Sequence, residues 1–136
     1  MDGGIVARTR GLWEVFNDRE LEALEEITAP GFVNRNALPE TPVGPEGHRQ
    51  VFERLWAAIP DACFEIERLA ADGDTTICVG TMSGTHAGKL LGVEATGAKF
   101  EWRQCHLYRF DADGLIVEHD AIRDDAGLFR QFGEDV

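Results

Sequence analysis

The sequence predicts one α+β domain in which helices come first along the chain and strands follow. Before Pro60, apolar residues recur at spacings of three and four, which is typical of amphipathic helices. After Pro60, strand-like segments are separated by short turns rich in glycine and aspartate. This order favours an antiparallel sheet with helices packed on one face. A length of 136 residues is about that of a single domain, so we expect residues 1–136 to form one unit.

Three helices are predicted in the first half of the chain. The apolar positions of residues 5–16 define the first helix, and Asn-Asp after it both ends this helix and begins a short second helix over 21–27. The Ala-Pro-Gly triplet that follows is expected to break the chain, and the proline-rich segment 32–45 is expected to be a loop. Pro45 suits the first turn of a third helix, which should extend to Ile59.

Five strands are predicted in the second half, because apolar alternation is interrupted at the turns ADGD, HAG, ATG and DADG. They cover residues 63–69, 75–86, 89–93, 99–110 and 115–123. The final GLFRQFG is expected to leave the sheet as a short helical turn.

Composition limits the classes of partner. The formal charge is -12, which disfavours phosphate backbones and anionic membrane surfaces, and no apolar run approaches the length of a membrane span. The three cysteines have no CxxC spacing, so we expect buried free thiols, no disulfide and no metal site. Cofactor-binding motifs are absent. We therefore expect a cytoplasmic protein that acts on a small molecule, with no cofactor, nucleic acid or membrane partner.

The last two predicted strands gather polar side chains on one face. If DADG is a four-residue hairpin loop, residues two apart share a face and each faces a partner across the hairpin. The inward pairs are then Trp102 with Arg123, Gln104 with Ala121, His106 with His119, Tyr108 with Val117 and Phe110 with Leu115. A mainly apolar face with a few polar groups is typical of a pocket wall. Asp120 and Asp124 point outward in this register, unless a β-bulge after His119 exchanges the two faces.

Facing histidines suit proton transfer, because imidazole both takes and gives a proton near neutral pH. A structural role for His106 and His119 remains an alternative. Arg123 is suited to polarising a carbonyl or binding an enolate, with Asp124 orienting it, or the two form surface salt bridges and a helix cap. For His86, which lies beside the GTHAG turn, a role in the site and a purely structural role are equally expected. His48 is expected to lie on the surface or to serve packing.

Four segments in order, GPEGHRQVFERLWAAIPD, GTHAGKLLGVEATG, HLYRFDADGLIVEH and RDDAGLFRQFG, resemble the SnoaL-like polyketide cyclase family, which has the nuclear transport factor 2-like (NTF2-like) fold. The similarity extends over about residues 5–133. It implies a cone-like barrel in which three N-terminal helices pack on a strongly curved antiparallel sheet around a deep apolar cavity. It also implies a homodimer and, in the cyclases, ring closure by a cofactor-free intramolecular aldol condensation.

Position by position, His106 and His119 match the two histidines of the family, and Asn34 matches its loop asparagine. The carboxylate that serves the cyclases as general acid and base falls at Ala121 here. The surrounding IVEHDAIRDD is similar to non-cyclase relatives with an EHWAVRDD-type segment, including members that take part in hydroxylation.

Three alternatives are open for the group that takes over the role of the carboxylate missing at position 121. Asp120 turns inward through a bulge, Asp124 reaches the cavity, or the two histidines perform the proton transfers alone.

The resulting functional expectation is an acid-base enzyme of polyketide-type secondary metabolism, a cyclase or hydroxylase, acting on a bulky enolisable aromatic substrate. Catalysis is assigned to His106, His119, Asp124 and Asp120, and substrate binding to Asn34, Trp56, His86, Trp102, Gln104, Tyr108 and Arg123. The alternatives are an epoxide hydrolase or isomerase of the same fold and a non-catalytic module that binds small molecules.

Overall fold

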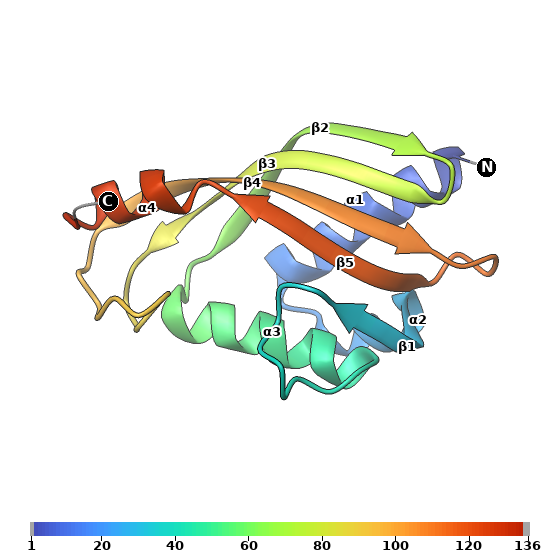
Figure 1. The fold of residues 1–136 in the computed structure, drawn as a ribbon, viewed down its shortest axis with the longest axis horizontal. Coiled ribbons are helices and arrows are strands. Elements are labelled where there is room, and N and C mark those ends of the chain that lie inside the picture. Colours follow the sequence, from blue (N-terminus) through green and yellow to red (C-terminus); the bar gives the residue numbers. More distant parts are fainter. Residues whose placement is uncertain (1, 135–136) are drawn as a thin grey trace.

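The computed structural model describes residues 2–134 and contains a five-stranded sheet with helices on its concave side (Figure 1). The strands have the order β1-β5-β4-β3-β2 across the sheet. The elements are α1 (Asp2–Asp18), a 3-10 turn η1 (Leu21–Ala23), α2 (Leu24–Ile27), β1 (Thr28–Asn34), α3 (Pro45–Ala58), β2 (Cys63–Asp72), β3 (Thr75–Thr85), β4 (Lys99–Phe110), β5 (Ile116–Arg123) and α4 (Asp125–Gln131).

The predicted α+β architecture is confirmed. Helix α1 packs on β2, and α3 packs beside β1 at the other end of the sheet, so the two helices and the curved sheet enclose one core. Its largest fully buried side chains include Phe16 of α1 together with Trp102 and Tyr108 of β4. Burial of such aromatic side chains is the main stabilising term of a domain this small.

The first and third predicted helices are confirmed, and the second is a 3-10 turn followed by a single α-helical turn. Pro45 occupies the first turn of α3, and Gly44 before it has φ +81. A Cβ on Gly44 would lie 2.6 Å from the carbonyl oxygen of Pro30, so this close approach of the loop to β1 requires glycine.

The expected break at Ala29-Pro30-Gly31 is wrong, because these residues belong to strand β1. β1 pairs in parallel with β5, which makes the otherwise antiparallel sheet mixed. Pro30 is tolerated because β1 lies at the edge of the sheet, where a strand has no ladder on its outer side. Conversely, the predicted strand over 89–93 is only a tight turn closed by a Leu90–Val93 bridge.

The predicted register of the β4–β5 hairpin is wrong by two residues. Asp111 N–H donates to Leu115 O, and an irregularity beside Val117 leaves Phe110 opposite Ile116. Ile116 is therefore fully buried, whereas the prediction placed it outside. Because a shift of two residues preserves the side-chain face, His119, Ala121 and Arg123 stay inward as predicted and line the cavity, whereas Val117 is the unpaired residue of the irregularity.

Among residues 2–134, no helix has the length and apolar character needed to cross a membrane. The same residues bring together no group of three His, Cys, Asp or Glu side chains suited to a metal ion. All three cysteines are free, but only Cys78 is buried; Cys63 is exposed and Cys105 is half-buried, so their predicted burial is correct for one thiol.

Candidate active site

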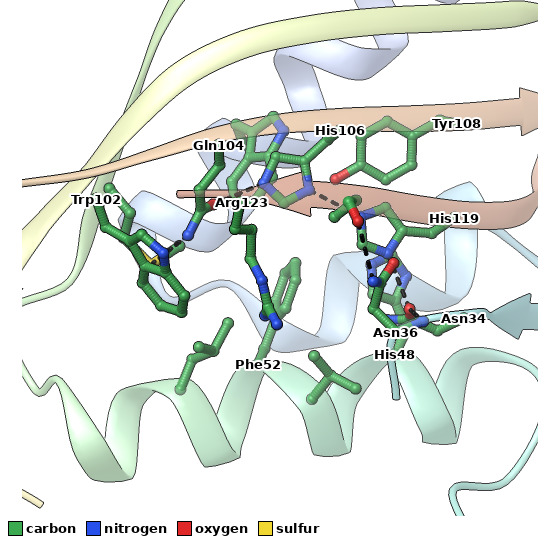
Figure 2. A pocket seen from close by; sticks show the side chains of 15 residues that line it. Asn34, Asn36, His48, Phe52, Trp102, Gln104, His106, Tyr108, His119 and Arg123 are labelled. Atoms are coloured by element: carbon green, nitrogen blue, oxygen red, sulfur yellow. Dashed lines mark hydrogen bonds between the residues drawn. The ribbon is translucent and has the colours of Figure 1, made fainter. Parts of the chain in front are cut away.

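A mainly apolar cavity lies between the concave face of the sheet and α3 (Figure 2). The space that the centre of a water molecule can reach inside it is about 80 Å³. Its wall is formed by Trp13, Val51, Phe52, Leu55, Met82, Trp102 and Ala121, and by the polar residues Asn34, Asn36, His48, Gln104, His106, Tyr108, His119 and Arg123.

Four of these polar side chains form one continuous hydrogen-bonded chain along the wall (Figure 2). His106 Nε2 lies 2.7 Å from Gln104 Oε1, and His106 Nδ1 lies 2.8 Å from His119 Nε2. His119 Nδ1 then lies 3.0 Å from Asn34 Oδ1. The register explains this geometry: His106 faces Ala121 and His119 faces Tyr108, so the two imidazoles meet diagonally across the strands.

The hydrogen bonds fix where the protons lie. Asn34 Oδ1 also accepts the backbone N–H of Asn36 at 2.9 Å, so this oxygen is held as an acceptor and His119 Nδ1 must donate to it. In a neutral pair, His119 Nε2 then accepts from His106 Nδ1, and the remaining lone pair lies on His106 Nε2. As placed, the Gln104 oxygen faces this nitrogen and the Gln104 N–H points to Met82 Sδ at 4.0 Å. The amide must therefore turn over to donate to the unprotonated nitrogen, whereas it accepts as it stands once that nitrogen gains a proton.

Burial makes both histidines weak bases. His106 is 6% exposed, and desolvation followed by the charge of Arg123 lowers its pKa to about 3. Desolvation, and then the neighbouring His106, lowers the pKa of His119 well below its ordinary value. Among the described residues, no aspartate or glutamate lines the cavity, so no anion opposes this effect. The pair is therefore neutral near pH 7.

Arg123 gives the cavity a cation near the histidine chain. Its guanidinium lies over the ring of Trp102, 5.1 Å from the centroid, and its Nε lies 3.7 Å from Asp125 Oδ1. Trp102 Nε1 donates to the same carboxylate oxygen at 3.1 Å. The shared Asp125 thus fixes the indole and the guanidinium relative to one another.

Residues 7–132 match the family of SnoaL-like polyketide cyclases. The chain belongs to this family. The aklanonic acid methyl ester cyclase DnrD of Streptomyces peucetius is 30% identical over 92% of this chain and 88% of its own length. The nogalonic acid methyl ester cyclase of Streptomyces nogalater is 28% identical over 88% of this chain and 90% of its own length.

Solved structures of related proteins have the same fold. TsrD from Streptomyces laurentii superposes with a TM-score of 0.86 at 25% identity, with 96% of both chains covered. IdmH from Streptomyces antibioticus gives a TM-score of 0.79 at 31% identity, covering 95% of this chain and 98% of its own.

This SnoaL-like chain brings seven of the predicted site residues to the cavity. They are Asn34, Trp102, Gln104, His106, Tyr108, His119 and Arg123. Ala121, the position that the resemblance singled out, also lines the cavity and is the pairing partner of His106.

The two candidate carboxylates lie elsewhere. Asp120 is exposed on the outer face of β5, because the bulge in this strand comes before His119 and leaves the alternation after it intact. Asp124 caps α4, where its Oδ1 accepts the backbone N–H of Gly127 at 2.8 Å. Neither side chain lines the cavity.

His86 and Trp56 are also placed outside the cavity wall. His86 is fully buried, with its ring nitrogens bonded to Thr96 Oγ1 and Val93 O, so its contacts hold the loop after β3. Trp56 lies on the side of α3 that packs on Phe16. In both cases, the sequence indicated burial without indicating which side of the core the residue faces.

His48 and Trp13 are among the wall residues that the sequence did not assign to the site. His48 is buried and bonded to Thr28 Oγ1 at 2.9 Å, and desolvation lowers its pKa to about 3. Its position four residues before Phe52 on α3 was the available signal. Trp13 of α1 lies 4.8 Å from the His106 ring between centroids, and its indole N–H is buried.

Proposed function

We propose that this SnoaL-like protein closes a ring within an enolisable aromatic polyketide by an intramolecular aldol reaction, using side-chain proton transfer. The observation that carries the proposal is the buried chain Asn34–His119–His106–Gln104, in which a neutral histidine pair keeps its one basic lone pair on His106 Nε2, next to the Gln104 amide. The described residues that line this apolar cavity include no carboxylate. The cyclase names of the relatives at about 30% identity support the same reaction class.

In this proposal, His106 Nε2 takes a proton from a carbon that lies between two carbonyl groups of the substrate. The enolate carbon then attacks a ketone carbonyl of the same molecule, which forms the new C–C bond and an alkoxide. The alkoxide takes the proton back from His106, so the enzyme ends unchanged. During the cycle, the His106 Nδ1–H bond to His119 helps to stabilise the imidazolium.

The negative charge that develops on oxygen needs donors inside the cavity. Arg123 supplies a cation at the cavity wall, with its guanidinium held over the ring of Trp102. Donors that are already fixed before the reaction are effective because they require no reorganisation.

The strength of the base is compatible with this role. Since burial lowers the pKa of His106 to about 3, its basicity is similar to that of an ordinary carboxylate, whose pKa is about 4. A desolvated imidazole therefore takes the place of the carboxylate that the resemblance leads us to expect at position 121. An epoxide hydrolase is less favoured, because the cavity wall, as formed by residues 2–134, offers no aspartate or glutamate to activate water.

The test uses aklanonic acid methyl ester, the compound in the name of the related cyclases. Ring closure is followed by liquid chromatography, and loss of the acidic C–H is followed by NMR in D₂O. His106→Gln should lower both rates about 100-fold or more, because a positioned acid-base group contributes about 10²- to 10⁴-fold. His119→Gln should cause a smaller loss, because this ring acts through His106.

His86→Gln is the matched control, because it changes a buried histidine outside the cavity. It should leave both rates unchanged at temperatures where the variant is folded. Full activity in folded His106→Gln would exclude the proposed base.

A further inference from the structure

A second groove adjoins the cavity. It offers about 200 Å³ to the centres of water-sized spheres and is more open to solvent. The two spaces share five wall residues: Asn36, Val51, Leu55, Trp102 and Arg123. The inner space of about 80 Å³ holds only a few waters or one end of a multi-ring molecule. A bulky ligand with its reacting end inside must therefore extend into this outer groove.

The groove is basic in an acidic protein. The chain has 25 acidic and 13 basic side chains, yet the described residues that line the two spaces include three cations and no carboxylate. The cations are Arg54 of α3, Lys89 of the loop after β3, and Arg123 at the shared wall. A carboxylate-free wall of this kind is complementary to an anion.

Each of these cations makes only long contacts with other side chains of the protein. Lys89 Nζ lies 3.8 Å from Glu94 in a pair whose side chains are 64% and 84% exposed, and Arg123 Nε lies 3.7 Å from Asp125. Arg54 Nη1 lies 3.4 Å from the neutral hydroxyl of Thr41. Charge-assisted hydrogen bonds are ordinarily about 2.7–2.9 Å long, so all three cations retain donor capacity for a ligand.

The groove also presents apolar side chains to solvent. Leu38 is 54% exposed and Leu91 is 41% exposed, and both line the groove. Leu91 has φ +49 and the following Gly92 has φ +82, in a two-residue turn closed by the Leu90–Val93 bridge. Such turns favour asparagine before glycine, and leucine in this conformation is strained. This turn therefore presents an apolar side chain to the same groove that the three cations line.

We propose that the outer groove binds a free carboxylate of the substrate, so that the enzyme acts on a polyketide acid in preference to its methyl ester. The assignment of the reacting end to the inner cavity rests on the proposed function. Arg54 and Lys89 contact the carboxylate, Leu38 and Leu91 contact the ring next to it, and the enolisable end reaches His106. Such a preference differs from the methyl esters in the names of the related cyclases.

The test measures binding of two probes that differ in one group, anthraquinone-2-carboxylate and methyl anthraquinone-2-carboxylate. Titration calorimetry gives each Kd at low and at physiological salt. We expect the acid to bind more tightly than the ester, with a preference that decreases as salt is raised. Arg54→Gln and Lys89→Gln should each weaken acid binding by up to about fivefold, the range for exposed charge pairs, and leave ester binding unchanged.

Arg68→Gln is the control, because it removes the same charge from an exposed position on β2 outside the groove. Equal affinity of the wild-type protein for acid and ester would overturn the inference, as would equal losses in Arg68→Gln and the groove variants. Because this is a binding measurement, its outcome is separate from the proposed catalysis. A preserved acid preference with full turnover in His106→Gln would reject the proposed base and keep the groove assignment.

Discussion

At the scale of single residues, position 121 has the greatest influence on the chemistry. Ala121 lies opposite His106 and lines the cavity, so a side chain placed there would be next to the proposed base. The neighbouring Asp120 and Asp124 face away from the cavity and leave His106 without an anionic partner. The low pKa of this histidine follows from burial without such a partner.

Ala121→Asp should therefore change the acid-base behaviour of the site. A carboxylate within about 4–6 Å favours the charged imidazole and is expected to raise the pKa of His106 by about 1–3 units. The acidic limb of the pH–rate profile should then move upward, into the range where the protein is folded, and turnover of the aklanonic ester should increase near pH 7. Ala121→Asn supplies a similar volume without the charge. Identical pH profiles for the two variants would contradict this account.

At the scale of elements, sequence periodicity predicted the long helices and the antiparallel run, because each buries one face in a regular pattern. It failed where the conformation that the local residues favour differs from the one that pairing with a distant strand imposes. Pro30 and Gly31 indicate a chain break, but the edge of the sheet accepts them in β1. The hairpin register depended on how the turn closes and on the irregularity beside Val117, neither of which has a sequence signal.

The predicted site is largely correct despite the error in register. Its residues on β4 and β5 are two apart along each strand, and a shift of two residues keeps them on the same face of the sheet. His106 and His119 still meet, although as diagonal neighbours. The residues contributed by helices were harder to predict. His48 and Trp13 required knowledge of which helix face lies above which strand, and that is set by packing of the whole domain.

The Leu90–Val93 turn provides a prediction for one element. Leu91→Asn replaces a strained leucine with a residue that adopts positive φ readily, and should stabilise the fold by about 1 kcal/mol. The same change removes an apolar contact from the outer groove, so both anthraquinone probes should bind more weakly. Chemical denaturation and calorimetry measure the two effects. Leu38→Asn is the comparison, because it removes a groove leucine without relieving turn strain. Unchanged probe binding in Leu91→Asn would argue against its contact with the ligand.

At the scale of the whole molecule, the fold keeps three histidines neutral in its interior. His48, His106 and His119 are all at least nine-tenths buried, and desolvation lowers the pKa of each. In the unfolded chain, their pKa values return to about 6.5. The unfolded state therefore binds protons that the folded state does not bind, as the pH falls below about 6.5 and toward about 3.

This difference predicts marked acid sensitivity. Each histidine should lower the free energy of unfolding by about 1.4 kcal/mol per pH unit within that window, so three together give about 4 kcal/mol per unit. Since small domains have about 5–15 kcal/mol of stability, we expect cooperative unfolding near about pH 4–5. Urea denaturation at pH 7, 6 and 5 measures the slope.

The window from pH 7 to 5 separates the histidines from the carboxylates. Hydrogen bonds from Thr85 to Asp61 and from Arg35 to Glu118 lower the pKa of those carboxyl groups, so their stabilising effect is lost only at more acidic pH. His48→Gln should reduce the slope by about a third, because one of the three buried imidazoles no longer contributes. Equal stability at pH 7 and pH 5 would mean that these histidines take up protons in the folded protein as they do in the unfolded chain, and would contradict the lowering of their pKa values by burial.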